Sequence, residues 1–169
     1  MPSVELQRAL SVPAVPARSA LSSIVHEIAD SRGDWSDFAL MLSFGVLGLP
    51  DVGYVAIPVS VSDLAEATEP RHEIRFKLRA RRSPEMFPEF DGAVGIDPTG
   101  ASNSSIWLAG DYAVPLKGLG SFFNQTLAHG AAEKSLTNML TELAEGVVAR
   151  VEKREMSAAR YRLVFNTGD

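Results

Sequence analysis

Histidine side chains are the first in this sequence that could carry acid–base or metal chemistry. The three histidines, His26, His72 and His129, show no i, i+4 pairing and no acidic ligand at metal spacing, so we expect no metal site. His72 shares the apolar side of an alternating segment with Phe76 and could reach the rim of a pocket. A core or edge histidine is the commoner outcome for such a residue.

Tyr112 is the other residue whose type could do chemistry. It lies on the apolar side of the alternating segment 106–114, and a buried tyrosine hydroxyl needs a hydrogen-bond partner. That hydroxyl could orient a ligand carbonyl or donate a proton in a cyclase-like reaction. Backbone or water satisfies such a group more often, so no catalytic residue is assigned.

Motifs for nucleophilic or nucleotide chemistry are missing. The sequence has no Gly-x-Ser-x-Gly, and neither 92–95 nor 118–120 completes a dinucleotide or phosphate-binding pattern. The acidic pairs Asp34 with Asp37 and Asp91 with Asp97 are explained by helix capping and by a solvent-facing strand. We therefore expect no cofactor.

Basic residues form one marked electrostatic feature. Arg75, Lys77, Arg79 and Arg81 alternate with apolar residues, so they share one exposed face of a strand. Cross-strand pairing with acids such as Glu73, Asp91 or Asp111 is the simpler interpretation. The alternative is transient contact with an anionic membrane or an acidic protein. Because the net charge is −5, we expect no nucleic-acid partner.

Length and composition favour one domain in a reducing compartment. A chain of 169 residues can bury a core without cross-links, and it has no cysteine for a disulfide or a thiolate metal site. The polar, proline-containing N-terminal segment does not resemble a signal peptide, so we expect a cytoplasmic protein. The longest nearly uncharged segment, Phe38–Pro50, is about 13 residues, too short to cross a bilayer.

Periodicity predicts the elements that position these residues. A strand over 4–12 ends before Pro13, helical spacing covers 17–31 up to Gly33, and a second short helix is expected from Phe38 to Gly45 or Gly48. Period-two alternation then predicts four strands, which cover 54–61, 72–81, 90–97 and 106–114. Pro58 would place the first of them at an edge or a bulge.

The last third of the chain is predicted to be one long helix. Apolar residues recur at helical spacing from about Gly120 to Lys153, which would give a helix long enough to cross a whole sheet. The tail, about 156–169, is either flexible or an added strand, because 160–165 alternates again.

The local sequence around the last strand resembles a known superfamily. Trp107–Gly120, WLAGDYAVPLKGLG, followed by Phe122-Phe123-Asn124 and the segment 131–136, is similar to the last strand and C-terminal helix of START-like proteins. These include the SRPBCC and polyketide cyclase-like proteins. The resemblance implies an α+β helix-grip fold, with a curved antiparallel sheet around the C-terminal helix and two short helices after the first strand. It covers about 54–151 in pattern, and 1–169 would form one START-like domain.

The resemblance also implies a hydrophobic ligand, such as a lipid, polyketide or isoprenoid, between the sheet and the C-terminal helix. Strand parity and helical spacing select the inward positions, which are Ile57, Val59, Phe76, Leu78, Val94, Leu108, Gly110, Tyr112, Phe123, Leu127, Ala131 and Met139. Small residues, namely Gly92, Gly110, Gly130 and Ala131, would make room for it. The alternatives are a solid core in a protein-interaction module, or a polyketide cyclase or aromatase in which Tyr112 and His72 act on a bound chain. The first third departs from the usual pattern at Phe38–Leu49, which could form a cavity lid.

Overall fold

The fold is seen in a computed structural model of the chain. It describes residues 2–30, 39–43, 54–67, 72–80, 89–113 and 125–165, and the side chains of 2–30, 60–67, 72–80, 89–113, 130 and 133–157. Everything below concerns these residues. The segments 31–38, 44–53, 68–71, 81–88 and 114–124 lie outside them, and so do most of the expected lid and the side chain of Arg81.

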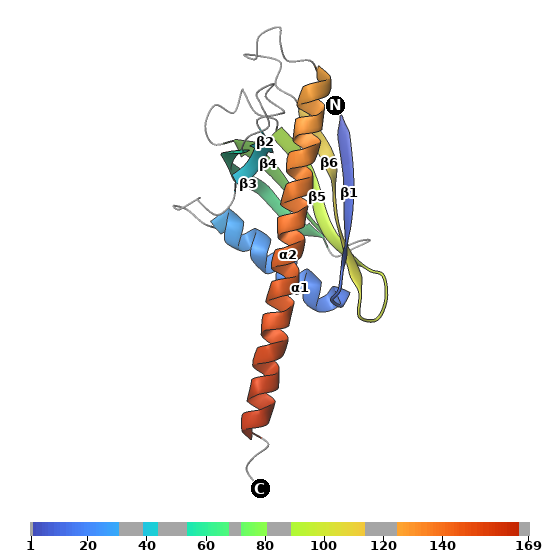
Figure 1. Cartoon of the computed structure of the whole chain (residues 1–169), viewed down its shortest axis with the longest axis vertical. Helices are drawn as coiled ribbons and strands as arrows, with labels where there is room; N and C mark the ends of the chain where they lie inside the picture. Colours follow the sequence, from blue (N-terminus) through green and yellow to red (C-terminus); the bar gives the residue numbers. More distant parts are fainter. Residues whose placement is uncertain are drawn as a thin grey trace.

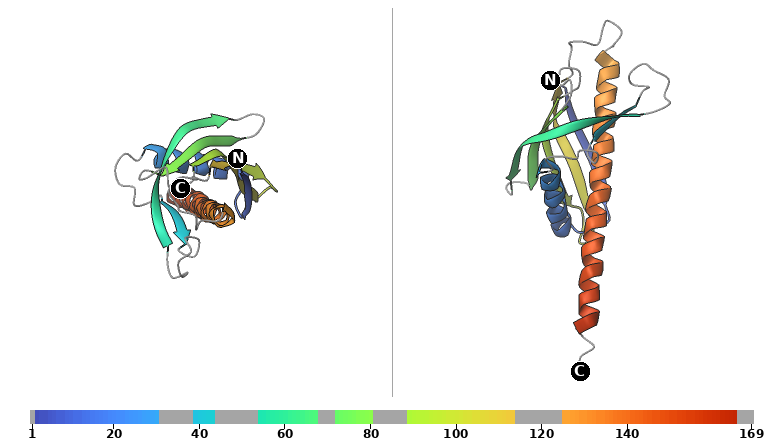
Figure 2. Two further views of the ribbon diagram at one scale, coloured as in Figure 1. Left: turned by 90° about the horizontal axis from the view of Figure 1, so that it is seen from above. Right: turned by 90° about the vertical axis from the view of Figure 1, so that its left-hand side faces the viewer.

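A six-stranded antiparallel sheet and two helices make up the described fold. The elements are β1 (Ser3–Leu10), α1 (Ala14–Asp30), β2 (Ala39–Ser43), β3 (Tyr54–Ala67), β4 (Glu73–Ala80), β5 (Glu89–Pro98), β6 (Ser104–Ala113) and α2 (Gln125–Phe165). The strand order is β1-β6-β5-β4-β3-β2. The sheet curves around α2, as Figure 1 and the view from above in Figure 2 show, which confirms the predicted helix-grip fold.

Helix α1 carries the chain from one edge of the sheet to the other. β1 pairs with β6 from Ser3 opposite Asp111 to Leu10 opposite Ser104, whereas β2 lies at the far edge beside β3. Between them α1 runs across the lower end of the sheet (Figure 1). The helix begins three residues before the predicted start, because Pro16 in its first turn has no N–H that needs a partner.

A second short helix was predicted from Phe38 to Gly45 or Gly48. This prediction is wrong for the described residues of that segment. Residues Ala39–Ser43 form strand β2, which pairs with β3 from Ala39 opposite Pro58 to Ser43 opposite Tyr54. A short run of apolar residues has no period that separates a helix from a buried strand. Pro58 lies where the pairing of β3 passes from β4 to β2, so its missing N–H costs little there.

Strand β3 is longer than predicted because a bulge lets it turn and continue. The pairing with β4 shifts between Ser62 and Ala65, and Asp63 has a φ of 55°. Asp63 pairs with Lys77 at 3.0 Å on the outer face. After the bulge the strand runs to Ala67 and brings Glu66 beside α1, where its carboxylate accepts a hydrogen bond from Ser22.

Helix α2 continues to Phe165, so the predicted strand or flexible tail at 160–165 was wrong for these residues. Its 41 residues give a length of about 60 Å, and its lower part extends beyond the sheet (Figures 1 and 2). Val151 is the last buried residue among the α2 side chains that are described, and Glu152–Ser157 are all exposed. After Gly146 the helix contains no glycine or proline that would end it, whereas a strand at 160–165 would need a partner strand.

The core lies between the inner face of the sheet and both helices. Strand β4 alternates as predicted, with Ile74, Phe76, Leu78 and Ala80 buried and the residues between them more exposed. The helices contribute apolar side chains to the same cluster, namely Ala17, Leu21 and Val25 from α1 and Leu136, Met139, Leu140, Leu143 and Val147 from α2. One continuous apolar cluster therefore joins all three layers.

The expected room at the glycines of β5 and β6 is filled. Gly92 lies opposite Gly110, and the ring of Phe90 lies over both. A Cβ on Gly110 would lie 2.5 Å from the Gly92 Cα and 2.8 Å from the Phe90 ring. Gly130 differs, because it is exposed on α2 and a Cβ there would meet no atom within 4 Å. Gly92 and Gly110 therefore allow the two strands and the Phe90 ring to pack closely.

Two glycine-to-alanine substitutions test this packing. We expect Gly110→Ala to lower the free energy of unfolding by about 1–3 kcal/mol, because strands and ring must move apart. We expect Gly130→Ala to raise it by about 0.5–1 kcal/mol, since alanine is the better helix former in open space. Urea unfolding measures both. Similar effects of the two substitutions would contradict the packing described.

Helices α1 and α2 are joined by a two-pronged ion pair. Both terminal nitrogens of Arg150 donate to the carboxylate of Glu27, at 2.8 and 2.7 Å, and Arg150 also donates to Ser23. The hydrogen bonds and charge of Arg150 hold the pKa of Glu27 below its usual value of 4.5. Because the folded-state pKa is depressed, the pair stabilises the fold above that value and the contribution is lost as pH falls through the folded pKa.

Glu27→Gln should therefore lower the melting temperature at pH 7, and the difference from the unsubstituted protein should shrink as pH falls below 4.5. Thermal melts across this pH range make the comparison. The matched control is Glu145→Gln, whose carboxylate lies 3.9 Å from Arg8, in a looser exposed pair, and should matter less. A difference for Glu27→Gln that is constant with pH would contradict the account.

Candidate functional site

The sheet face toward α2 holds most of the predicted ligand-binding residues. Six of them have described side chains that are at most 5% exposed and belong to the same apolar cluster, namely Phe76, Leu78, Val94, Leu108, Tyr112 and Met139. Gly110 is half-buried beneath the Phe90 ring. Ile57 and Val59 lie in β3, and Leu127 and Ala131 lie in α2, with side chains outside the description; Phe123 lies outside it entirely.

Helix α2 lies across this face of the curved sheet. Its backbone lies near β1 and β6 on one side and near β2 on the other, whereas β3, β4 and β5 keep a greater distance over the described residues. The view from above in Figure 2 shows the same arrangement. Side chains therefore occupy the distance between α2 and the central strands.

Two layers of side chains can be distinguished in this space. The lower layer, at the level of α1, includes Val94, Ile96, Ile106, Leu108 and Val147, none of which has exposed surface. The upper layer lies toward the first turns of α2 and contains Leu78, Ala80, Phe90 and Tyr112. Phe90 packs on Phe76 with ring centres 5.6 Å apart and planes tilted by 44°. The lower layer is a solid floor.

Tyr112 is the polar group of the upper layer. Its main-chain N–H donates to the Pro2 carbonyl at 3.0 Å, which ties the start of β1 to β6. Burial, with a smaller contribution from the carboxylate of Glu133, raises the pKa of its hydroxyl above 10. At neutral pH the hydroxyl therefore keeps its proton and can serve as a hydrogen-bond donor to a neighbouring group.

His72 is too far from Tyr112 to act on the same atom. Since Glu73 pairs with Gly95 and Gly95 with Trp107, His72 stands at the level of Ile106, six residues along β6 from Tyr112. Six residues of strand span about 20 Å. The two side chains could therefore contact only different parts of a bound chain.

The basic residues of β4 are paired where they are described. Arg75 contacts Glu73 at 2.7 Å, Lys77 contacts Asp63 and Asp91, and Arg79 contacts Glu89 at 2.6 Å. Pairing with Glu73 and Asp91 was predicted, whereas Asp63 and Glu89 were missed because the bulge and register bring them there. Three of the four cations therefore have acidic neighbours on the outer face.

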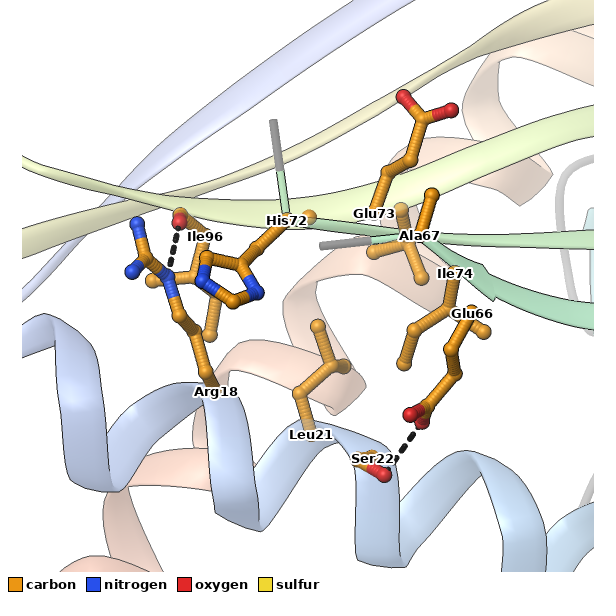
Figure 3. Close-up of a pocket in the computed structure, with 11 residues that line it drawn as sticks. Arg18, Leu21, Ser22, Glu66, Ala67, His72, Glu73, Ile74 and Ile96 are labelled. Carbon is orange, nitrogen blue, oxygen red and sulfur yellow. Dashed lines mark hydrogen bonds between the residues drawn. The ribbon is translucent and has the colours of Figure 1, made fainter. Parts of the chain in front are cut away.

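A hollow that was not predicted from the sequence lies between α1 and the lower ends of β3, β4 and β5. It has a volume of about 350 Å³, including its mouth. Figure 3 shows Arg18 and His72 at one end, Leu21 beneath, and Glu66 with Ser22 at the other end. The i, i+4 spacing of Arg18 and Ser22 put both on one face of α1, but the sequence did not show that this face lies on the sheet.

No described group of side chains is suited to a metal ion. Among the residues described, no cluster of three or more histidine or acidic residues has the required arrangement. Over the same residues, no helix is both long enough and apolar enough to cross a membrane. What the arrangement offers chemically is apolar surface with single hydrogen-bond donors.

Comparison with known proteins gives similarity of fold. No protein-family model and no curated protein sequence matches the chain. Solved structures that resemble it include a conserved protein from Geobacillus kaustophilus, with 13% identity, 90% of this chain and 96% of that chain covered, and a TM-score of 0.49. The Zhui aromatase/cyclase from Streptomyces sp. R1128 shares 13% identity, with 90% and 94% covered and a TM-score of 0.45.

A START superfamily protein from Mycobacterium smegmatis is also similar, with 15% identity, 89% of this chain and 97% of that chain covered, and a TM-score of 0.40. The helix-grip fold predicted from the sequence is confirmed by the structure itself. It rests on the strand order and on the helix held by the curved sheet. At these identities nothing about ligand or activity follows.

A titration tests the environment of Tyr112. The chain has three tyrosines, and the one with the raised pKa should ionise above the ordinary value of 10. Ultraviolet absorbance of tyrosinate should show a late phase that Tyr112→Phe removes, with circular dichroism confirming that the fold persists. A late phase that survives Tyr112→Phe would contradict burial of this hydroxyl.

Proposed function

We propose that the protein binds a hydrophobic small molecule, such as a lipid, a polyketide or an isoprenoid, between the upper part of the sheet and the first half of α2. The observation that supports this is the position of α2, which lies near the two edges of the sheet and farther from its central strands. A ligand there would contact apolar side chains of the upper layer, among them Leu78, Ala80 and Phe90.

The solid lower layer sets the depth of this site. Because Val94, Ile96 and Leu108 have no exposed surface, a ligand could not pass below them without unpacking the core. The bound molecule would therefore rest on this floor and approach from the end where α2 begins. Its apolar surface would replace water-exposed area, which stabilises the complex by about 25 cal/mol per Å² buried.

Tyr112 would give such a ligand its orientation. Its hydroxyl is protonated at neutral pH and belongs to the upper layer, so it can donate to a carbonyl or hydroxyl oxygen of the ligand. The proposal requires no chemical step.

Native mass spectrometry with organic extraction tests binding directly. We expect an apolar molecule to copurify at a defined stoichiometry, or the emptied protein to bind a fluorescent fatty-acid probe. A protein that is empty and also fails to bind the probe would contradict the proposal and favour a solid-core interaction module.

A pair of alanine substitutions locates the site. Ala80 lies in the upper layer and Ala20 lies in the packed part of α1, and both are buried. We expect Ala80→Leu to abolish probe binding with little loss of stability, because it fills ligand space. Ala20→Leu should cost about 1–3 kcal/mol by overpacking and leave binding intact in the folded fraction. Equal destabilisation by the two would show that the upper layer is solid.

A further inference from the structure

The hollow between α1 and the lower strand ends is a separate site from the one above the floor. It is lined by side chains of α1, β3, β4 and β5, and Val94 and Ile96 separate it from the upper layer. We propose that this hollow binds a small organic carboxylate, whose anionic group pairs with Arg18 and whose apolar body lies over Leu21 and Ile74.

The Arg18 guanidinium provides a positive charge at one end of the hollow. The Nε of Arg18 donates to the Ile96 carbonyl at 2.9 Å, which fixes the guanidinium at one end of the hollow. No described carboxylate lies within ion-pair distance of Arg18. The terminal nitrogens of Arg18 can therefore donate hydrogen bonds to a ligand. No described acidic side chain neutralises the charge of this guanidinium. A planar carboxylate matches this fork of donors.

The acidic residues of the hollow already have partners. The Glu66 carboxylate accepts from the Ser22 hydroxyl and lies 3.6 Å from the His26 Nδ1. Glu73 pairs with Arg75, and its carboxylate points away from α1 (Figure 3). A cationic ligand would have to compete with these contacts, whereas an anion at Arg18 displaces none of them.

The remaining lining decides the size and character of the ligand. Leu21 and Ile74 expose a little apolar surface between the two polar ends, and Ala67 is partly exposed, whereas Val94 and Ile96 are fully buried. The centres of water-sized molecules can occupy about 60 Å³ of the hollow, which is room for a few waters, so a ligand can be no larger than a single ring or a short chain and part of it stays outside the mouth. The ring of His72 lies beside the guanidinium (Figure 3) and offers a further polar contact to the carboxylate.

Phenylacetate is a probe with these properties, and phenylacetamide is its uncharged counterpart. In an amide ¹H–¹⁵N titration we expect phenylacetate to shift resonances of Leu21, Ile74 and Ile96, with a dissociation constant on the order of 1 mM. Phenylacetamide should bind at least about tenfold more weakly, because it lacks the charge that Arg18 recognises.

Three variants complete the test. Arg18→Gln should weaken phenylacetate binding at least about tenfold, whereas Arg79→Gln, which removes the same charge from the outer sheet face, should leave it unchanged. Ala67→Leu should block the hollow while keeping Arg18. Thermal melts establish that each variant is folded. Binding of the upper-site probe should persist in all three, which separates this site from the proposed function.

Several outcomes would overturn the proposal. Phenylacetate could shift no resonances at 20 times the expected dissociation constant, about 20 mM, or shift only those of Leu78, Phe90 and Tyr112 in the upper layer. Equal binding of phenylacetamide, or unchanged binding by folded Arg18→Gln and Ala67→Leu, would show that neither the charge nor the hollow recognises the ligand.

Discussion

An antiparallel sheet with one apolar face must have that face covered, and the rest of this structure depends on how the cover is made. The alternation in β4 places four apolar side chains on one side and charged ones on the other, and β5 and β6 extend the same face. Curvature lets a single helix, α2, reach both edges of the sheet. α1 closes the lower end and is held to α2 by Arg150 and Glu27.

This cover has different consequences at the two ends of the molecule. Where α1 and α2 both lie on the sheet, Ile106, Leu108 and Val147 have no exposed surface. Toward the start of α2, the described buried side chains of the sheet are apolar except for Tyr112. Where the face of α1 meets the strand ends, polar residues of α1, β3 and β4, with His72 just before β4, line the hollow around Arg18.

The fold could be predicted where a residue pattern is compatible with only one type of secondary structure. The strict alternation of 72–81 gave the correct inner and outer faces of β4, and the helical spacing of 17–31 gave α1 except for its first turn. Ala39–Ser43 was wrongly predicted as helix, because an apolar run reads alike in a helix and in a buried strand. The extension of α2 to Phe165 was missed because a locally alternating sequence can also be helical.

The site was less predictable than the fold because it depends on contacts between distant residues. Parity correctly gathered Phe76, Leu78 and Tyr112 on one face, but it could not show that Phe90 fills the space at Gly92 and Gly110. Arg18, Glu66 and His72 meet only because α1 crosses the sheet and a bulge prolongs β3. No residue spacing in the sequence indicates that these three side chains come close together.

The central claim is that apolar space exists between the central strands and the first half of α2, above a solid floor. Xenon enters empty apolar cavities, so methyl resonances recorded under xenon pressure test it most directly. We expect saturable shifts for the methyl groups of Leu78 and Ala80 and none for those of Ile106, Leu108 and Val147, which are fully buried. Shifts absent from Leu78 and Ala80, or equal in both layers, would contradict it.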